Sequence, residues 1–256
     1  MSIELKHVSK RFVDNVVLDG VDFVVAEGET IALLGPSGVG KSVLLKHIIG
    51  LIKPDSGEVW VDGQQVPLLG RKALALLRSR IGYVFQNGAL FDSMDVFENI
   101  RLGITDEEKY ADKDYCIQRV RECLRLVNLN EEVGSKLPSE LSGGMRKRVG
   151  ISRAIAGKPV YLLYDEPTSG LDPVNADVID SLIERLQQEI GVTSVVVTHD
   201  VRGAFRVADR IALLSKAKIR AVGTADEIIA SRDPVVQQFL ERDFEMAVIL
   251  ANEEKS

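Results

Sequence analysis

The fold of this chain is decided by the stretch Gly35-Pro36-Ser37-Gly38-Val39-Gly40-Lys41-Ser42. A short apolar run over residues 31–34 precedes it, and a helix-like pattern over residues 43–49 follows it. A strand, a glycine-rich loop and the start of a helix, in that order, are the context in which a P-loop works. An ordinary glycine-rich turn is the alternative, and the complete motif with both flanks in place argues against it.

The residue types of this motif suit the binding of a triphosphate. Its glycines let backbone N–H groups converge on phosphate oxygens without interference from Cβ atoms. The helix N-terminus adds partial positive charge. Lys41 can reach the β- and γ-phosphates, and the Ser42 hydroxyl can ligate Mg²⁺. We therefore expect the chain to bind a nucleoside triphosphate together with Mg²⁺.

Composition narrows the class of protein. The 256 residues suit one large domain or a core with a subdomain. A formal charge of −6 gives no electrostatic reason to expect nucleic acid. No run approaches the roughly eighteen apolar residues of a membrane span, and residues 1–6 lack the apolar core of a signal peptide. These features predict a cytoplasmic protein without a nucleic-acid partner.

Hydrophobic periodicity divides the chain into an α/β part and a helical part. Strands are predicted at residues 3–8, 16–25, 29–34, 58–63, 81–85, 160–164, 194–198, 210–214 and 218–222. Residues 90–140 lack such runs, and residues 112–127 show apolar positions at helical intervals. This indicates a helical insertion into an α/β core. Cys116 and Cys123 share one face of that helix and are interpreted as packing residues, with a redox role as the alternative.

A second group of candidate residues follows two buried strands. The apolar run 160–164 ends in Asp165-Glu166. Asp165 can reach Mg²⁺ through its water shell, and Glu166 can act as a general base on the attacking water. An acidic exit from a strand is the alternative, but it explains poorly why two adjacent carboxylates occur in a chain with a P-loop. His199 follows the strand 194–198, at the end where α/β proteins place ligands.

Two further features remain open on residue types alone. Leu141-Ser142-Gly143-Gly144-Met145 leads into a basic helix, and its Ser-Gly-Gly is either a second anion site or a serine cap with a flexible loop. Phe12 is expected in the first loop, after Lys10-Arg11. Its ring either stacks on a purine or packs in the core beneath the first hairpin.

Taken together, the P-loop, the Leu-Ser-Gly-Gly segment and the strand ending in Asp-Glu resemble those of ABC-type ATPases, over about residues 2–241. The resemblance implies an α/β fold with a RecA-like P-loop NTPase core, an antiparallel β subdomain and an inserted α-helical subdomain. Residues 1–89 and 146–241 would form the core and the β subdomain. Residues 90–145 would form the helical subdomain, and residues 242–256 a C-terminal tail.

The same resemblance implies a role for each candidate residue. One ATP would be held by Phe12 and residues 35–42 of one chain and, from a second copy, by Ser142, Gly143 and Gly144. Mg²⁺ would be held by Ser42, Gln86 and Asp165, and the catalytic groups would be Glu166, His199 and Gln86. The D-loop would be Ser169, Gly170, Leu171 and Asp172. Position 145 departs from many members, being Met rather than Gln.

A homodimer is also expected on physical grounds. Two copies related by head-to-tail symmetry can sandwich two ATP molecules, each between one P-loop and the other copy's signature segment, residues 141–145. ATP that touches both copies only when they are closed shifts the population toward the closed pair. Hydrolysis removes the bridging phosphate and reopens it. The segment 86–99 is the expected transmitter to a membrane partner.

A finer resemblance lies in residues 86–100 and in the P-loop helix, residues 42–50. Both are similar to those of the Mla/Mce-associated ATPases, which energise lipid movement between membranes in double-membraned bacteria. This implies phospholipid as cargo, an MlaE-like permease, an Mce-domain protein outside the membrane, and a place on the cytoplasmic face of the inner membrane.

Three alternatives remain beside the lipid transporter: another ABC importer, for instance of amino acids; a non-transport ABC ATPase serving DNA repair or the ribosome; and a small P-loop kinase. The tail, residues 242–256, is expected to be either frayed or docked on a partner, with docking favoured.

Overall fold

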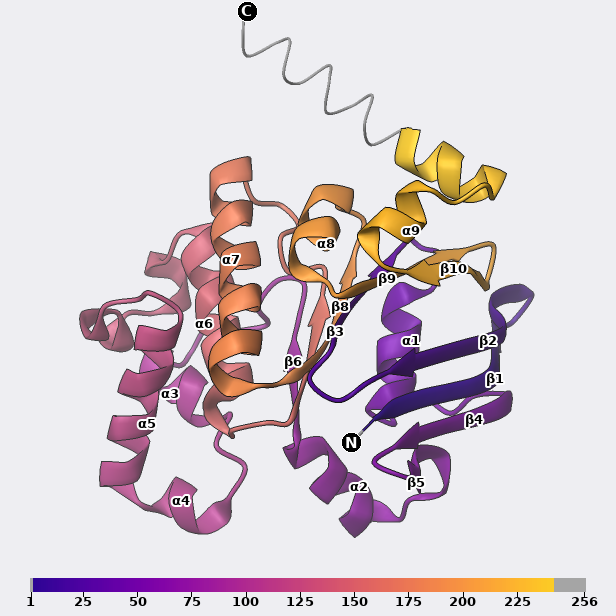
Figure 1. The fold of residues 1–256 in the computed structure, drawn as a ribbon. Helices are drawn as coiled ribbons and strands as arrows, with labels where there is room; N and C mark the ends of the chain where they lie inside the picture. Colours follow the sequence, from indigo (N-terminus) through magenta and orange to yellow (C-terminus); the bar gives the residue numbers. More distant parts are fainter. Residues whose placement is uncertain (1, 242–256) are drawn as a thin grey trace, which may run out of the picture.

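The computed structural model describes residues 2–241, and it contains two β-sheets beside a group of helices (Figure 1). The predicted tail, residues 242–256, lies outside the described residues, so its docking stays a prediction. Near the end of the described chain, α9 (Ala225–Ile229) is followed by a helical segment over residues 234–241. None of the helices within residues 2–241 is long and apolar enough to cross a membrane.

The larger sheet positions the candidate site. Its strands are β3 (Thr30–Leu34), β6 (Ile81–Val84), β7 (Tyr161–Asp165), β8 (Thr193–Thr198), β9 (Arg210–Ser215) and β10 (Lys218–Gly223). They are ordered β10-β9-β3-β8-β7-β6, and all neighbours are parallel except β9 and β10. Every residue of β3 and β8 is buried, as expected for a parallel sheet covered on both faces. The carboxyl ends of β3, β7 and β8 therefore meet at one edge.

The smaller sheet is antiparallel, with the order β2-β1-β4-β5. Its strands are β1 (Ile3–Phe12), β2 (Asn15–Val25), β4 (Ser56–Val61) and β5 (Gln64–Gln65). Apolar residues of this sheet, of β3 and of α1 (Lys41–Ile48) form one continuous core. The prediction that Phe12 lies in a loop is wrong, because β1 continues to a tight hairpin in which Phe12 pairs with Asn15. Residues 9–12 of β1 are partly or fully exposed, so this end of the strand carries no apolar alternation.

The helices divide between the core and an insertion. They are α1 (Lys41–Ile48), α2 (Arg71–Ser79), α3 (Val96–Arg101), α4 (Glu107–Ala111), α5 (Lys113–Leu126), α6 (Gly143–Ala156), α7 (Pro173–Ile190), α8 (Val201–Val207) and α9 (Ala225–Ile229). Figure 1 shows α3, α4 and α5 on the side of the molecule opposite the smaller sheet. They pack with α6 and α7 around a second core that contains the buried, unpaired Cys116 and Cys123, in agreement with a packing role. The predicted fold class is thereby confirmed.

Candidate nucleotide site

The loop between β3 and α1 requires glycine at two of its positions. Gly35 has φ +156°, and a Cβ there would lie 2.3 Å from the backbone oxygen of Leu214. Gly40 has φ +113°, and a Cβ there would lie 2.5 Å from a methyl carbon of Val17. Larger residues would clash with these neighbours, so the loop can curl this tightly only with glycine. The curl leaves α1 beginning at Lys41, directly at the edge where the strands of the larger sheet end.

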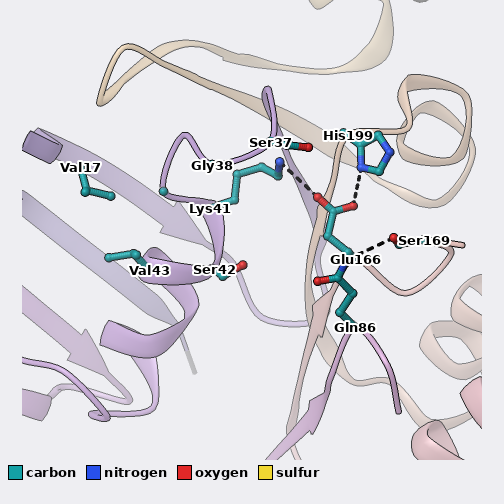
Figure 2. Close-up of a pocket in the computed structure, with 11 residues that line it drawn as sticks. Val17, Ser37, Gly38, Lys41, Ser42, Val43, Gln86, Glu166, Ser169 and His199 are labelled. Atoms are coloured by element: carbon teal, nitrogen blue, oxygen red, sulfur yellow. Dashed lines mark hydrogen bonds and ion pairs between the residues drawn. The ribbon is translucent and has the colours of Figure 1, made fainter. Parts of the chain in front are cut away.

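Lys41 is held inside the loop rather than extended into solvent. Its Nζ donates to the carbonyl oxygens of Gly35 at 2.7 Å and Pro36 at 3.2 Å. It also pairs with Oε1 of Glu166 at 3.2 Å, and the Lys41 side chain is only 5% exposed. Figure 2 shows this ion pair crossing from the loop to the end of β7. The lysine of the P-loop and the predicted general base are therefore direct neighbours.

Glu166 is fixed from both sides. Its second oxygen, Oε2, lies 2.7 Å from Nδ1 of His199, which follows β8 (Figure 2). The Glu166 backbone is left-handed, with φ +50°, a conformation that few residues other than glycine adopt. Its N–H donates to the carbonyl of Val197 at 2.8 Å, one residue beyond the last pairing of β7 with β8. This turn of the backbone is part of what aims the carboxylate at Lys41 and His199.

Asp165 and Ser42 form an oxygen-rich corner of the site. The Ser42 hydroxyl donates to Oδ1 of Asp165 at 2.6 Å, and the Tyr83 hydroxyl donates to Oδ2 at 2.9 Å. Burial and the charge of Asp165 raise the pKa of Tyr83, so the phenol stays a donor. Mg²⁺ prefers hard oxygen ligands such as carboxylate and hydroxyl. The donor set of this corner therefore fits that ion.

Gln86 and the predicted D-loop meet beside this corner. The Gln86 amide donates from Nε2 to the Ser169 hydroxyl at 3.2 Å, as the dashed line in Figure 2 marks. The pocket at this edge is lined by Val17, Ser37, Gly38, Gly40, Lys41, Ser42, Val43, Gln86, Glu166, Ser169 and His199. Asp172, at the end of the predicted D-loop, caps α7 by accepting from the backbone N–H of Asn175 at 3.0 Å.

The predicted signature residues lie outside this pocket. Ser142, Gly143 and Gly144 are absent from its lining, and α6 begins among them. The Ser142 hydroxyl accepts from the Met145 backbone N–H at 3.3 Å, as an N-cap does. A Cβ on Gly144 would lie 2.7 Å from Oδ1 of Asn175 on α7. Within residues 2–241, the signature and the P-loop thus do not share one pocket.

Phe12 also stands apart from the lining residues. Its side chain is 44% exposed, and the Lys10 ammonium lies 5.4 Å from the centre of its ring. The alternative of a core phenylalanine is therefore wrong. The stacking role stays a prediction, with Val17 of β2 forming the pocket wall on this side.

Residue types alone missed two groups that touch the candidate site residues: Tyr83, which bonds to Asp165, and Lys147, which bonds to Gln86 and Glu166. Tyr83 lies in the short apolar strand β6, where a tyrosine is expected to pack as a core residue, and the sequence does not indicate a partner for its hydroxyl group. Lys147 belongs to a helix that is basic over much of its length, yet its Nζ donates to the carbonyl oxygens of Gln86 and Glu166. For both residues the sequence shows only a polar group close to a motif, and this does not predict the direction of the side chain.

Asp180 and Asp200 line a neighbouring pocket, which His199 and Ser169 also line. A Cβ on Gly203 would lie 2.9 Å from Oδ2 of both Asp180 and Asp200, so the two acids face each other across this glycine. Burial, and then the charge of Asp200, raises the pKa of Asp180 to about 7, although Arg206 opposes the shift. Asp180 is 5% exposed.

Asp180→Asn should raise the free energy of unfolding at pH 8 by roughly 1–4 kcal/mol, and by a smaller amount at pH 5, where only the unfolded carboxyl is ionised. The folded chain keeps the Asp180 proton up to about pH 7, whereas the unfolded chain releases it near 3.8. The stability that this carboxyl contributes is therefore complete below pH 3.8 and lost as the pH rises to 7. Chemical denaturation at both pH values measures the gain, with Asp92→Asn as control, because Asp92 is exposed and is not among the charges that shift Asp180. Equal gains at pH 5 and pH 8 would contradict it.

Comparison with known proteins identifies the group to which these features belong. The sequence profile of the ABC transporter family matches residues 18–169. The intermembrane phospholipid transport system ATP-binding protein MlaF of Haemophilus influenzae is 39% identical over 238 residues, which cover 93% of this chain and 89% of that protein. The sulfate/thiosulfate import ATP-binding protein CysA of Caulobacter vibrioides is 43% identical over 231 residues, covering 89% of this chain and 66% of that protein. Overall identity therefore does not separate the phospholipid from the sulfate branch.

A solved structure matches in fold as well as in sequence. It is the dimeric post-hydrolysis state of the ATP-binding cassette MJ0796 bound to ADP and Pi, with a TM-score of 0.78 and 34% identity. The match covers 87% of this chain and 98% of that one.

Proposed function

Since the chain belongs to the ABC transporter family, as an ATP-binding subunit whose ATP hydrolysis drives transport, we propose that its cargo is phospholipid. The proposal has two parts. The first assigns the residues that hydrolyse ATP, and the second assigns the membrane partner and its cargo.

The observation that carries the first part is the placement of Glu166 between Lys41 and His199, at 3.2 Å and 2.7 Å. We assign Lys41 and the backbone of residues 35–42 to the phosphates, and Glu166 to the proton of the attacking water. Ser42, Gln86 and Asp165 would hold Mg²⁺, which neutralises phosphate charge when bound.

The buried ion pair suggests how binding prepares the base. Lys41 cannot serve Glu166 and a triphosphate fully at once, so the phosphates draw its ammonium from Oε1 of Glu166. The released oxygen can then accept a proton from water, while His199 keeps the other oxygen in place. Hydrolysis yields ADP and phosphate.

The second half of each site is assigned to another copy of the chain. Ser142, Gly143 and Gly144 present the N-terminus of α6, which attracts anions, yet they do not line the pocket of their own chain. A head-to-tail pair would bring each signature to the partner's nucleotide. The dimeric state of MJ0796 with ADP and Pi supports a dimer as the working form.

The segment that resembles the Mla/Mce ATPases supports the second part. Buried Asn99 on α3 ties it into a closed loop, accepting from the N–H of Phe91 at 2.8 Å and donating to the carbonyls of Phe91 and Met94 at 3.1 and 3.0 Å. The Phe91 side chain is 53% exposed. An apolar ring on a firmly held loop, which follows Gln86 in the sequence, suits a coupling contact with a permease. We therefore place the chain against its permease, on the cytoplasmic face of the inner membrane.

Purification from its native host should test the assignment. We expect the tagged chain to bring down a polytopic permease and an Mce-domain protein. In proteoliposomes, this complex should move fluorescent phosphatidylethanolamine to acceptor vesicles in an ATP-dependent way. The same complex with Glu166→Gln is the control and should move little. A complex that moves no phospholipid, but whose ATPase is stimulated by sulfate or an amino acid with a binding protein, would contradict the proposal.

A further inference from the structure

A buried lysine links the helix of the signature segment to two elements of the site. Lys147 lies in the second turn of α6 and is 6% exposed. Its Nζ donates to the carbonyl oxygen of Gln86 and, at 3.3 Å, to that of Glu166. Burial lowers the pKa of Lys147, and the charge of Glu166 acts against that shift. A buried ammonium is costly unless it is hydrogen-bonded, so losing either carbonyl would be unfavourable, and Lys147 keeps both carbonyls close to α6.

The same helix holds the chain just beyond Gln86. Arg153 donates from Nη2 to the carbonyl of Gly88 at 2.8 Å and from Nη1 to that of Ala89 at 2.7 Å. Between the two cations, a Cβ on Gly150 would lie 3.0 Å from Cα of Gly88. Residues 86–89 therefore lie against α6 along two turns of the helix. Lys147 differs from Arg153 because it also reaches the end of β7.

The second carbonyl that Lys147 reaches, just beyond the end of β7, belongs to Glu166, the strained residue of the site. Glu166 has φ +50°, and such a conformation persists only when its surroundings hold it. Its carbonyl accepts from the Ser169 N–H at 3.2 Å as well as from Lys147. Lys147 is thus one of the groups that fix the direction of the Glu166 carboxylate.

We propose that Lys147 is a positioning residue for ATP hydrolysis, which fixes the Gln86 and Glu166 backbones relative to the helix that carries the signature. This rests on the roles proposed above for Glu166 and for Ser142, Gly143 and Gly144. When α6 brings the signature to the partner's nucleotide, the bonds of Lys147 make the backbones of Gln86 and Glu166 in the same chain move together with α6. Docking of the signature and alignment of the base are then one event.

The test compares two side chains of similar length that differ in their ability to donate. Lys147→Met should lower kcat by about ten- to a hundred-fold, the effect of a small misplacement of a reacting group. The KM for ATP should stay within about two-fold, because Lys147 touches no group assigned to the phosphates. Lys147→Gln keeps an N–H donor without charge and should recover most of kcat. Lys147→Ala should lower kcat to the same extent as Lys147→Met. It leaves room for water at both carbonyls and is used in place of the Met variant if that variant does not fold.

Arg119→Met is the matched structural control. Arg119 is a buried cation that donates to the carbonyls of Ile155 and Ala156 at the other end of α6, away from the site. It should lower the melting temperature without lowering kcat. The proposal is overturned if Lys147→Met, or Ala in its place, turns over ATP like the wild type, or if Gln is no better than Met. Glu166→Gln measured in parallel separates the two failures: near-normal turnover there rejects the role of Glu166, whereas an inactive Glu166→Gln beside a fully active Lys147→Met rejects only the role of Lys147.

Discussion

Glu166→Gln should cut ATP turnover by about 10²–10⁴-fold while ATP binding is kept. The amide matches the carboxylate in shape, so His199 and the backbone near Val197 can keep their places. It cannot accept the proton of the attacking water, however. The change also removes the anion that holds Lys41 at 3.2 Å, which leaves the ammonium free for phosphate. Affinity for ATP should therefore be equal to or higher than that of the wild type.

Phosphate release under single turnover and equilibrium binding of a fluorescent ATP analogue measure the two quantities separately. Glu189→Gln is a suitable control, because this half-exposed carboxylate on α7 pairs only at 3.7 Å with Arg185 and does not line the pocket. The variant should also accumulate as closed pairs in ATP, since the bridging nucleotide is no longer consumed. Turnover within about three-fold of the wild type would remove Glu166 from the role of base.

The parts of the site that the sequence predicts well are local. In the P-loop, eight consecutive residues and their flanks determine the backbone path, and Gly35 and Gly40 show why no other residue fits. The strand ends were also predictable, because buried apolar runs reveal where β7 and β8 stop. The structure adds the parallel pairing of β7 with β8, which places Glu166 beside His199.

The parts that the sequence does not predict depend on the direction of single side chains. α6 carries basic residues around its circumference, so nothing in its pattern tells that Lys147 and Arg153 point inward. The ion pair of Lys41 with Glu166 joins residues far apart in sequence and requires both the loop and the sheet to be in place. Phe12 was misplaced because the partly exposed end of a hairpin lacks the alternation that reveals a strand.

Mixing two inactive variants should restore activity if each site is built from two copies. Lys41→Ala removes the phosphate contact of its own chain. Ser142→Asp keeps the N-cap of α6, since Asp caps as well as Ser, but its charge repels the partner's triphosphate. Each variant alone should be nearly inactive. In a mixed pair, one site joins the intact Lys41 of one copy to the intact Ser142 of the other.

Random pairing of equal amounts makes half of the dimers mixed, and one of the two sites in each is intact. The mixture should therefore reach about a quarter of wild-type ATPase activity if the sites act independently. Ser142→Asn, which caps without charge, is the control and should keep most activity by itself. Energy transfer between labelled copies confirms that subunits exchange. If they exchange and the mixture is no more active than its parents, the signature does not complete the site of the partner, because every mixed pair contains one unaltered Lys41–Ser142 combination that should have hydrolysed ATP.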